Sequence, residues 1–426
     1  MNAVVHPSQL KGNITAPASK SAMQRACAAA LIRKGDTILL NPGVSNDDKA
    51  ALDIIRQLGA VHQWRGQEIV VSSKGVQPVS NEINCHESGL SIRMFTSIAA
   101  LSDQQITVNG SGSLAKRPMN FFDEVLPQLG VIITSNSGHL PIIIHGPMQP
   151  RNVTIDGSLS SQYLTGLLFA YAAADAKDVS IVVKNLNSKP YIDLTLQVLK
   201  AFKLKVPENR NYEEFYFANE SRNDVQQTIS YSVEGDWSGG AFLLTAAAIA
   251  GNFKIQGLDK ESSQADKAVL QALKQSGADI SFDGGDMFIR KSDLRGFHFN
   301  ATDCPDLFPP LVSLASYCKG ESVITGISRL THKESNRAIT LQQEFGKLGV
   351  PVRFIDDNMI IDGGRPLKGA EVSSHNDHRI AMATAVAALG AEDRVTVTGA
   401  EAVNKSYPQF WEHIKTLGAQ ISLTDN

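Results

Sequence analysis

Six segments rich in Ala, Gly and Ser recur along the 426-residue chain, and each is apolar on several faces. A helix that is apolar on all sides is usually buried, and a repeated unit of fixed length indicates a repeat architecture. The pattern therefore predicts six buried helices, one in each of six repeats. The segments begin near Lys20, Leu90, Ser160, Asp236, Cys304 and Asn376, at successive intervals of 70, 70, 76, 68 and 72 residues.

A second helix with a different pattern follows each buried one. Its apolar residues are spaced three and four positions apart, which is typical of a helix with one buried face. Residues 48–64 and 407–423 show this pattern and pass through Leu-Gly, and Gly just after a last turn is a favoured helix stop. Extended segments precede and follow the two helices. Each repeat is therefore predicted to run strand–helix–strand–helix–strand–strand, or βαβαββ.

The first and last segments of the sequence indicate how the repeats are grouped. The sixth repeat stops after ISLTDN, one strand short, and residues 2–9 form a spare strand. We expect this strand to complete the sixth repeat. The predicted fold is α/β (α+β) with two domains, each an inside-out α/β barrel of three βαβαββ repeats around buried parallel helices. The N-terminal domain would comprise residues 17–233, and the C-terminal domain residues 1–16 plus 234–426, with crossings near 16–19 and 233–236.

Composition and charge narrow the class of protein. The chain is 42% hydrophobic and 19% charged, with a formal net charge of -3, which argues against a nucleic-acid partner. No apolar run reaches the roughly 18 residues that span a bilayer, and the first residues lack the pattern of a signal peptide. We expect a cytoplasmic monomer without membrane association, whose cysteines are buried free thiols. The cysteines are Cys27, Cys85, Cys304 and Cys318.

Charged and hydroxyl side chains gather where the helices begin. By the repeat symmetry, the three buried helices of a domain point their N-termini the same way, and each N-terminus favours an anion. A cation there opposes the helix dipole, so a bound anion is expected to offset it. A single Lys or Arg at a helix start is more often a solvated surface residue. The residues concerned are Lys20, Ser21, Arg25, Arg93, Ser160, Ser161, Gln162, Asp306, Asp377, His378 and Arg379, with Arg117, Ser188, Lys189, Tyr191, Lys333, Glu334, Arg337 and Lys405 in loops before the second helices.

Ten segments that hold or border these residues resemble, in order, the motifs of the EPSP synthases, a family of enolpyruvyl transferases. They are PASKSAMQRA, ESGLSIR, LAKRP, DGSLSSQYLTGLL, SKPYIDLT, VEGDWSGGAF, CPDLFPP, HKESNR, NDHRIAMA and KSYPQFW. The resemblance spans nearly the whole chain. It implies two domains that close over the substrates, and transfer of the enolpyruvyl group of phosphoenolpyruvate to the 5-hydroxyl of shikimate 3-phosphate. It implies no metal and no cofactor.

The resemblance also implies roles for the matched positions. The Gly89 contact would be made through its backbone, and Arg329 is matched only loosely. The implied shikimate 3-phosphate contacts are Lys20, Ser21, Arg25, Ser160, Ser161, Gln162, Ser188, Tyr191, Asp306, Lys333 and Arg329. The implied phosphoenolpyruvate contacts are Lys20, Gly89, Arg117, Gln162, Arg337, Arg379 and Lys405.

The reaction needs proton donors and acceptors within hydrogen-bond reach of two substrate positions, and cations around the developing negative charge. We expect Glu334 to protonate the methylene carbon and Asp306 to receive the hydroxyl proton. Lys20 would anchor the substrate and transfer protons, with its proton affinity lowered if Arg117 and Arg337 lie beside it. The alternative for Glu334 is an ion pair with a neighbouring cation. His378 is a further candidate for proton relay.

Two positions depart from the usual pattern, and two prolines restrict a helix. Glu87 and Leu90 stand where the family usually has Asn and Thr. An acidic Glu87 near an anion site would be unfavourable unless a cation pairs with it. Pro309 and Pro310 follow Asp306. Because proline fits only the first turn of a helix, the fifth buried helix should begin there.

Two other functions fit the same repeats. The related transferase that acts on UDP-N-acetylglucosamine usually has Lys-Asn in place of Lys20-Ser21, and a reactive Cys near Arg117. Residues 111–120 contain no Cys, which argues against it. A non-catalytic repeat scaffold is the second alternative, because fold does not fix function. A scaffold would not need the acid–base set of Lys20, Asp306, Glu334 and His378.

Overall fold

The computed structural model describes residues 1–220, 227–331 and 333–425. The chain forms two compact units. The N unit is Lys20–Val233, and the C unit combines Met1–Ser19 with Glu234–Asn426. Each unit has its own sheets and its own core.

The N unit contains three four-stranded sheets of one design. The strands are β3 (Gly35–Leu40), β4 (Val61–Arg65), β5 (Glu68–Ser73), β6 (Glu82–Asn84), β7 (Gln105–Asn109), β8 (Ile132–Ser135), β9 (Ile142–His145), β10 (Val153–Asp156), β11 (Val179–Lys184), β12 (Glu208–Arg210), β13 (Glu214–Phe217) and β14 (Ile229–Ser232). The strand orders are β14-β3-β5-β4, β6-β7-β9-β8 and β10-β11-β13-β12. The first two strands of each sheet pair in parallel, and the other pairs are antiparallel.

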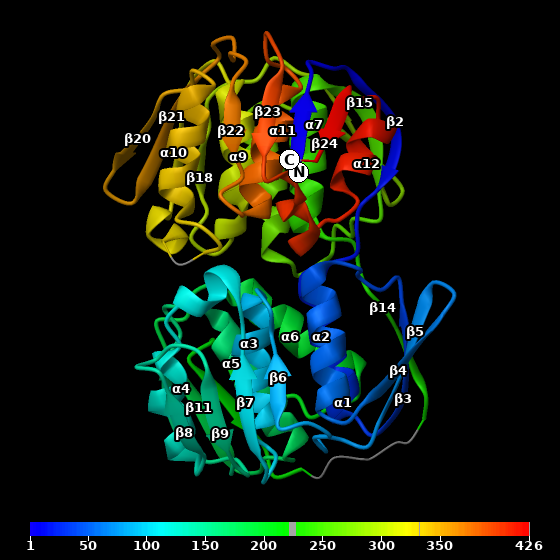
Figure 1. Cartoon of the computed structure of the whole chain (residues 1–426), viewed down its shortest axis with the longest axis vertical. Helices are drawn as coiled ribbons and strands as arrows, with labels where there is room; N and C mark the ends of the chain where they lie inside the picture. The colour runs from blue at the N-terminus through cyan, green and yellow to red at the C-terminus, as the bar shows by residue number, and fades with distance from the viewer. Residues whose placement is uncertain (221–226, 332, 426) are drawn as a thin grey trace. The chain divides into compact units, whose positions relative to one another are not determined.

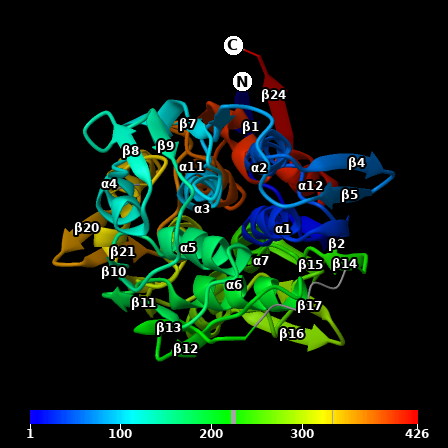
Figure 2. The ribbon, with the colours of Figure 1, turned by 90° about the horizontal axis from the view of Figure 1, so that it is seen from below.

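Three buried helices fill the centre of the N unit. They are α1 (Lys20–Ile32), α3 (Gly89–Ala99) and α5 (Ser161–Ala173). All residues of α3, and all those of α1 after its first two, are buried. These helices contact one another, and Figure 2 shows them inward of the strands. The remaining helical segments are α2 (Asn46–Gln57), η1 (Gly112–Lys116), α4 (Asn120–Val125), η2 (Leu126–Leu129) and α6 (Lys189–Ala201).

The C unit repeats the same sheet design. Its strands are β1 (Asn2–Val5), β2 (Leu10–Thr15), β15 (Gly251–Gln256), β16 (Asp279–Asp283), β17 (Asp286–Arg290), β18 (His298–Asn300), β19 (Gly320–Thr325), β20 (Val352–Ile355), β21 (Asn358–Gly363), β22 (Glu371–Ser373), β23 (Val395–Thr398) and β24 (Ile421–Thr424). The orders are β2-β15-β17-β16, β18-β19-β21-β20 and β22-β23-β1-β24. β1 is antiparallel to both of its neighbours, with Asn2 opposite Thr398 and Thr424.

Every residue of the three central helices of the C unit is buried. They are α7 (Trp237–Ala250), α9 (Phe308–Ser316) and α11 (His378–Ala388). Pro309 and Pro310 lie in the first turn of α9, as predicted. The other helical segments are η3 (Ala265–Ala268), α8 (Val269–Gln275), η4 (Pro305–Leu307), η5 (Ile327–Leu330), α10 (Arg337–Lys347), η6 (Ala400–Lys405) and α12 (Phe410–Thr416). With helices inside and sheets outside in each unit (Figure 1), the predicted inside-out α/β fold is confirmed.

Each of the two connections between the units begins with a strand that pairs within the unit it leaves. β2 precedes α1 in the chain, but it pairs with β15 of the C unit. β14 precedes α7, but it pairs with β3 of the N unit. Each unit thus obtains the first strand of one sheet from the segment that leads into the other unit.

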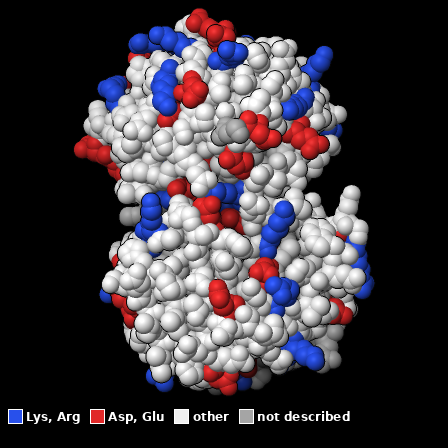
Figure 3. Space-filling view, viewed as in Figure 1, with Lys and Arg blue, Asp and Glu red and all other residues white. Residues whose placement is uncertain are grey.

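The charged surface, the cysteines and the apolar helices can each be compared with the sequence. On the face that Figure 3 shows, basic and acidic side chains are interspersed. All four cysteines are buried and free, as predicted. Among the described residues, no helix is both long and apolar enough to cross a lipid bilayer.

Asp48 in α2 provides a test of stability against pH. Its Oδ2 accepts hydrogen bonds from the Ser45 backbone N–H (3.0 Å) and hydroxyl (2.6 Å) in a capping box. Burial raises the pKa of Asp48 to about 7. Because this pKa lies above the unfolded value of about 3.9, the native protein should lose stability as pH rises from about 4 to about 7. We expect Asp48→Asn to be more stable relative to the native protein at pH 8 than at pH 5, by a difference on the order of 2 kcal/mol. Urea unfolding at both pH values measures this, and equal differences would contradict it.

Candidate active site

The three buried helices of the N unit bring their first turns together. The hydroxyl groups of Ser88 and Ser91, at the start of α3, donate to Gln24 Oε1 of α1 at 3.1 and 3.0 Å. Arg93 of α3 donates to Gln162 Oε1 of α5 at 2.9 Å. These contacts join the same end of all three helices. The N-terminal dipoles therefore act on one region, as the sequence predicted.

Lys20, the first residue of α1, has an acidic partner that the sequence did not suggest. Its Nζ lies 2.8 Å from Asp47 Oδ2 in the first turn of α2. The Lys20 and Asp47 side chains are only 15% and 11% exposed. The expectation that Lys20 is surrounded by cations omitted this ion pair. Asp47 resembles the acidic residue common in the first turn of any helix, so the sequence carried little signal of its contact.

Arg117 lies against the backbone at the start of α3. A methyl carbon placed on Gly89 would be 2.8 Å from Arg117 Nη1 and 3.2 Å from Arg93 Nη1. Arg117 also donates to Ser113 Oγ at 3.1 Å and is 5% exposed. The absence of a side chain at Gly89 thus allows the guanidinium to approach the helix N-terminus. The predicted Gly89, Arg117 and Gln162 therefore belong to one cationic cluster with Arg93.

Arg25 is the hub of a second group in the N unit. Its guanidinium donates to Thr195 Oγ1 (2.9 Å), Thr165 Oγ1 (3.4 Å), and the carbonyl oxygens of Ser21 (2.9 Å) and Tyr191 (3.3 Å). Burial lowers the pKa of Arg25 to about 10, which leaves it charged at neutral pH. These four bonds use most of the five N–H donors of an arginine. Arg25 therefore joins α1, α5 and α6, and neither threonine was predicted from the sequence.

The predicted hydroxyl residues lie at helix starts in the same unit. Ser160 is the N-cap of α5, and its Oγ accepts from the Gln162 backbone N–H at 3.3 Å. Ser161 is the first residue of α5 and is buried. Ser188 is the N-cap of α6, with a left-handed backbone at φ 57°. The Tyr191 ring lies 5.9 Å from the Arg25 guanidinium carbon.

Arg337, the first residue of α10, connects three carboxylates in the C unit. Its Nε and Nη2 donate to Asp377 at 2.8 and 3.1 Å, in a bidentate contact. Nη1 donates to Asp306 at 2.7 Å, and Nη2 to Glu334 at 2.6 Å. The side chain is 1% exposed. Although burial alone would lower it, these three acids hold the pKa of Arg337 above its ordinary value.

Asp306 is surrounded by cations. Its Oδ1 lies 2.7 Å from Arg337 and 3.3 Å from Lys333, and its Oδ2 lies 3.0 Å from Arg379. Burial alone would raise the pKa of Asp306, but the charges of Arg379, Lys333 and Arg337 hold it well below its ordinary value. The carboxylate is still 25% exposed. Asp306 is thus an ionised group that an incoming molecule can reach.

The remaining predicted residues of the C unit border this cluster. His378, the first residue of α11, is buried, and its Nδ1 lies 3.8 Å from Asp377 Oδ1. Lys405 donates to the carbonyl of Asn376, next to Asp377, at 2.6 Å. Arg329 of η5 interacts with the charge of Asp306, and burial lowers the pKa of its guanidinium. His332, the first residue of the motif HKESNR, lies outside the described residues.

The C-unit cluster contains five cations and four carboxylates. The cations are Arg329, Lys333, Arg337, Arg379 and Lys405, and the acids are Asp303, Asp306, Glu334 and Asp377. The excess of positive charge at the helix N-termini favours an anionic ligand. The expectation that only a ligand offsets the helix-start cations was incomplete, since the protein's own acids neutralise part of their charge.

The two departures from the family pattern, Glu87 and Leu90, lie at the start of α3. The Ser113 backbone N–H donates to Glu87 Oε2 at 3.4 Å, and a side chain on Gly112 would strike this carboxylate. Glu87 therefore contacts the loop that carries Arg117. Leu90 is the second residue of α3 and is buried.

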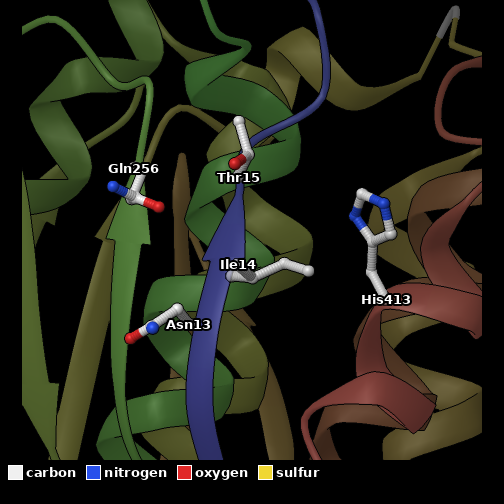
Figure 4. Close-up of a pocket in the computed structure, with 5 residues that line it drawn as sticks. All are labelled: Asn13, Ile14, Thr15, Gln256 and His413. Carbon is white, nitrogen blue, oxygen red and sulfur yellow. The ribbon is translucent and has the colours of Figure 1, made fainter.

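A separate cavity of about 300 Å³ lies outside both clusters. Figure 4 shows Ile14 and Thr15 on β2 and Gln256 on the neighbouring β15, with His413 across from them on α12. None of the predicted site residues lines it. Within the described ranges, no group of three or more His, Cys, Asp or Glu side chains is arranged to hold a metal ion.

Comparison with known proteins identifies the family. The family model for EPSP synthase (3-phosphoshikimate 1-carboxyvinyltransferase) matches residues 4–414. The chain is 33% identical to the 3-phosphoshikimate 1-carboxyvinyltransferase of Clostridium novyi over 430 residues, covering 99% of this chain and 98% of that protein. It is 35% identical to that of Methanocorpusculum labreanum over 424 residues, covering 99% of both. The solved structure of EPSP synthase from Acinetobacter baumannii matches with a TM-score of 0.82 at 26% identity, covering 99% of this chain and 100% of that one. With its motifs, its fold and its relatives in agreement over almost the whole length, this chain belongs to the EPSP synthase family.

Proposed function

We propose that the protein transfers the enolpyruvyl group of phosphoenolpyruvate to the 5-hydroxyl of shikimate 3-phosphate and releases phosphate. The observation that carries this proposal is the C-unit cluster, where Arg337 holds Asp306 and Glu334 by adjacent nitrogens at 2.7 and 2.6 Å. Two carboxyl groups among excess cations suit an anionic substrate that must gain one proton and lose another. Family membership supports the same reaction.

The reaction divides into an addition and an elimination. In the addition, the methylene carbon of phosphoenolpyruvate gains a proton, and C2 becomes electrophilic. The 5-hydroxyl oxygen bonds to C2 and loses its proton, which gives a tetrahedral intermediate. In the elimination, the C2–O bond to phosphate breaks and the methyl group returns a proton, so the double bond is restored. The atoms balance without a covalent enzyme intermediate.

We assign Glu334 to the carbon proton and Asp306 to the hydroxyl proton. An aspartate whose pKa is held well below its ordinary value by Arg379, Lys333 and Arg337 is a weak base. Phosphoenolpyruvate bound to Arg337 and Arg379 would compete with Asp306 for their charge. Its arrival would therefore raise the proton affinity of Asp306 at the moment when a base is needed.

The other residues have binding roles in this proposal. Lys20, which pairs with Asp47, binds the substrate and transfers protons. His378, which lies next to Asp377, relays protons. Arg25 contributes mainly by positioning Ser21 and Tyr191, whose carbonyl oxygens accept its hydrogen bonds. The remaining phosphoenolpyruvate contacts are Gly89, Arg117, Gln162, Arg337, Arg379 and Lys405. The remaining shikimate 3-phosphate contacts are Ser21, Arg25, Ser160, Ser161, Gln162, Ser188, Tyr191, Asp306, Lys333 and Arg329.

The proposal extends to the setting of the enzyme. It works as a cytoplasmic monomer of two domains, with residues 17–233 in one and residues 1–16 plus 234–426 in the other. The partners are the two small-molecule substrates. Size-exclusion chromatography with light scattering tests the monomer, for which the expected mass is 46.0 kDa.

The test is phosphate release from phosphoenolpyruvate with two acceptors in parallel. We expect release with shikimate 3-phosphate and none with UDP-N-acetylglucosamine. Release only with the nucleotide sugar would favour the related transferase, and release with neither would favour a scaffold. Arg117→Ala and Arg379→Ala should each raise the KM for phosphoenolpyruvate. Lys116→Ala is the control, because Lys116 is the exposed neighbour of Arg117.

Gly89→Ala should weaken phosphoenolpyruvate binding without unfolding the N unit. The new methyl group would lie 2.8 Å from Arg117 Nη1, the flexible end of a side chain, so the guanidinium must move. A displacement of this kind should raise the KM for phosphoenolpyruvate by about 10–100-fold. Gly346→Ala is the matched control, since nothing lies within 4 Å of its added carbon. An unchanged KM would show that Arg117 does not depend on Gly89.

A further inference from the structure

Glu344 is a buried carboxylate that the proposed reaction leaves without a role. It lies on α10, and only 2% of its side chain is exposed. Its Oε2 accepts a hydrogen bond from the Ser373 backbone N–H at 2.8 Å, and its Oε1 lies 2.7 Å from His375 Nε2. Lys347, one turn further along α10, donates to Oε2 at 2.7 Å. Although burial alone would raise the pKa of Glu344, these bonds hold it below its ordinary value. Glu344 is therefore a buried charge whose partners are all supplied by the protein.

Two of these three partners belong to one short stretch of chain, residues 373–377, which leads from β22 into α11 and is called the 373–377 segment below. His375 and Asn376 both have a left-handed backbone, at φ 49° and 55°. This conformation is unfavourable for residues other than glycine, and it persists where surrounding contacts hold it. Glu344 contacts the residue at which the segment begins and the first of the two left-handed residues. We infer that these contacts help to hold the segment in its observed conformation.

The 373–377 segment in turn places two proposed contacts of phosphoenolpyruvate. Asp377 ends the segment as the N-cap of α11, and its Oδ1 accepts from the Arg379 backbone N–H at 3.0 Å. The Arg379 guanidinium lies 3.0 Å from Asp306 Oδ2 in the C-unit cluster. Lys405 donates to the carbonyl of Asn376 at 2.6 Å. A shift of the segment would therefore move Arg379 and remove the group that orients Lys405.

The helix α10 contacts the 373–377 segment at two places. Arg337, its first residue, makes the bidentate contact with Asp377. Glu344 lies about two turns further along, on the same side of the helix, and contacts the other end of the segment. α10 also packs against β22 and α11, the two elements that the segment joins. Arg337 is a proposed substrate contact, whereas Glu344 is not, so the second place can be altered without removing a group that binds substrate.

We propose that Glu344 is a positioning residue for substrate binding: by holding Ser373 and His375 it fixes the 373–377 segment, and through this segment the place of Arg379 at the anion site. Arg379 touches the substrate, and Glu344 acts on it through the segment. This inference rests on the proposed function, since it takes phosphoenolpyruvate as the anion that Arg379 binds.

The test is Glu344→Ala, with the KM for each substrate measured at a saturating concentration of the other. The KM for phosphoenolpyruvate should rise by at least about tenfold, because small displacements of substrate-binding groups have effects of this size. The KM for shikimate 3-phosphate should change much less, since none of its proposed contacts lies on the segment. An unchanged KM for phosphoenolpyruvate would overturn the proposal. Equal rises in the two KM values would also overturn it, because they would indicate a general loss of structure.

Three further variants separate positioning from other roles. Glu344→Gln should recover most of the loss, because the amide can accept from the Ser373 N–H and donate to the His375 ring. His375→Ala removes one contact and should raise the KM for phosphoenolpyruvate by about 2–10-fold, the usual contribution of a single hydrogen bond. Lys347→Ala is the matched control, because Lys347 binds the same carboxylate from within α10 and is 47% exposed. It should leave both KM values unchanged, and a rise equal to that of Glu344→Ala would count against the proposal.

Hydrogen exchange of the backbone amides of residues 373–379, measured by mass spectrometry, repeats the comparison without turnover. Exchange should be faster in Glu344→Ala than in the native protein and in Lys347→Ala, and equal exchange would reject the proposal. If Glu344→Ala does not fold, His375→Ala provides the same comparison. If the native protein released no phosphate from phosphoenolpyruvate with either acceptor, the proposed function would fail, while the exchange rates would still decide whether Glu344 fixes the segment.

Discussion

Replacing Arg337 with alanine should destabilise the protein by about 3–5 kcal/mol, because it leaves charged groups buried without their partner. Arg337 is 1% exposed and binds Asp306, Glu334 and Asp377, the last of which is 0% exposed. Removing the guanidinium leaves these three carboxylates close together in the interior, without the cation that they share. Urea unfolding at pH 7 measures the loss.

The same change should abolish most of the activity. Arg337 both binds the proposed substrate and holds the two acid–base residues, so kcat/KM should fall by at least about 10³-fold. Arg365→Ala is the control: Arg365 is 64% exposed and pairs with Asp362 at the surface, where such pairs contribute about 0–1 kcal/mol. Equal losses of stability in the two variants would contradict the buried role of Arg337.

Glu334→Gln should lower kcat by about 10²–10⁴-fold, the usual contribution of general acid–base catalysis. The amide oxygen can still accept the hydrogen bond that Arg337 donates to Glu334 Oε2 at 2.6 Å. The change therefore removes the carboxyl group that would carry the transferred proton, and it preserves the contact with Arg337. The KM for phosphoenolpyruvate should change little, and steady-state kinetics at pH 7 separate the two quantities.

Glu321→Gln is the matched control for this change, since Glu321 pairs with Arg353 at the surface and is 51% exposed. It should leave kcat unaltered. A normal kcat in Glu334→Gln would instead mean that Glu334 serves only as the ion-pair partner of Arg337. The structure contains that ion pair, so kcat is the quantity that separates the two roles.

Repetition made the fold predictable. Six copies of one pattern revealed the six buried helices, which a single copy would not have distinguished from an ordinary apolar segment. The proline pair at Pro309 and Pro310 fixed the start of α9, because proline restricts the backbone locally. The short 3-10 helices η1 to η6 were not predicted, since three to six residues carry no usable periodicity.

The partners of the candidate site residues were much harder to predict. Lys20 and Asp47 are 27 positions apart, and Arg25 and Thr195 are 170 apart. Such contacts depend on how repeats pack, which local patterns do not encode.

A chain emerging from a ribosome cannot finish the C unit until β24, which ends at Thr424, has been translated. β1 is made first, yet its partners β23 and β24 end at Thr398 and Thr424. At about 5–20 residues per second, roughly 20–80 s pass between the two events. The described strands of the N unit are complete once Ser232 is made, so this unit can fold during synthesis. At that time β1 and β2 still lack the strands with which they form hydrogen bonds. Chaperones that shield nascent chains should therefore act mainly on those first strands.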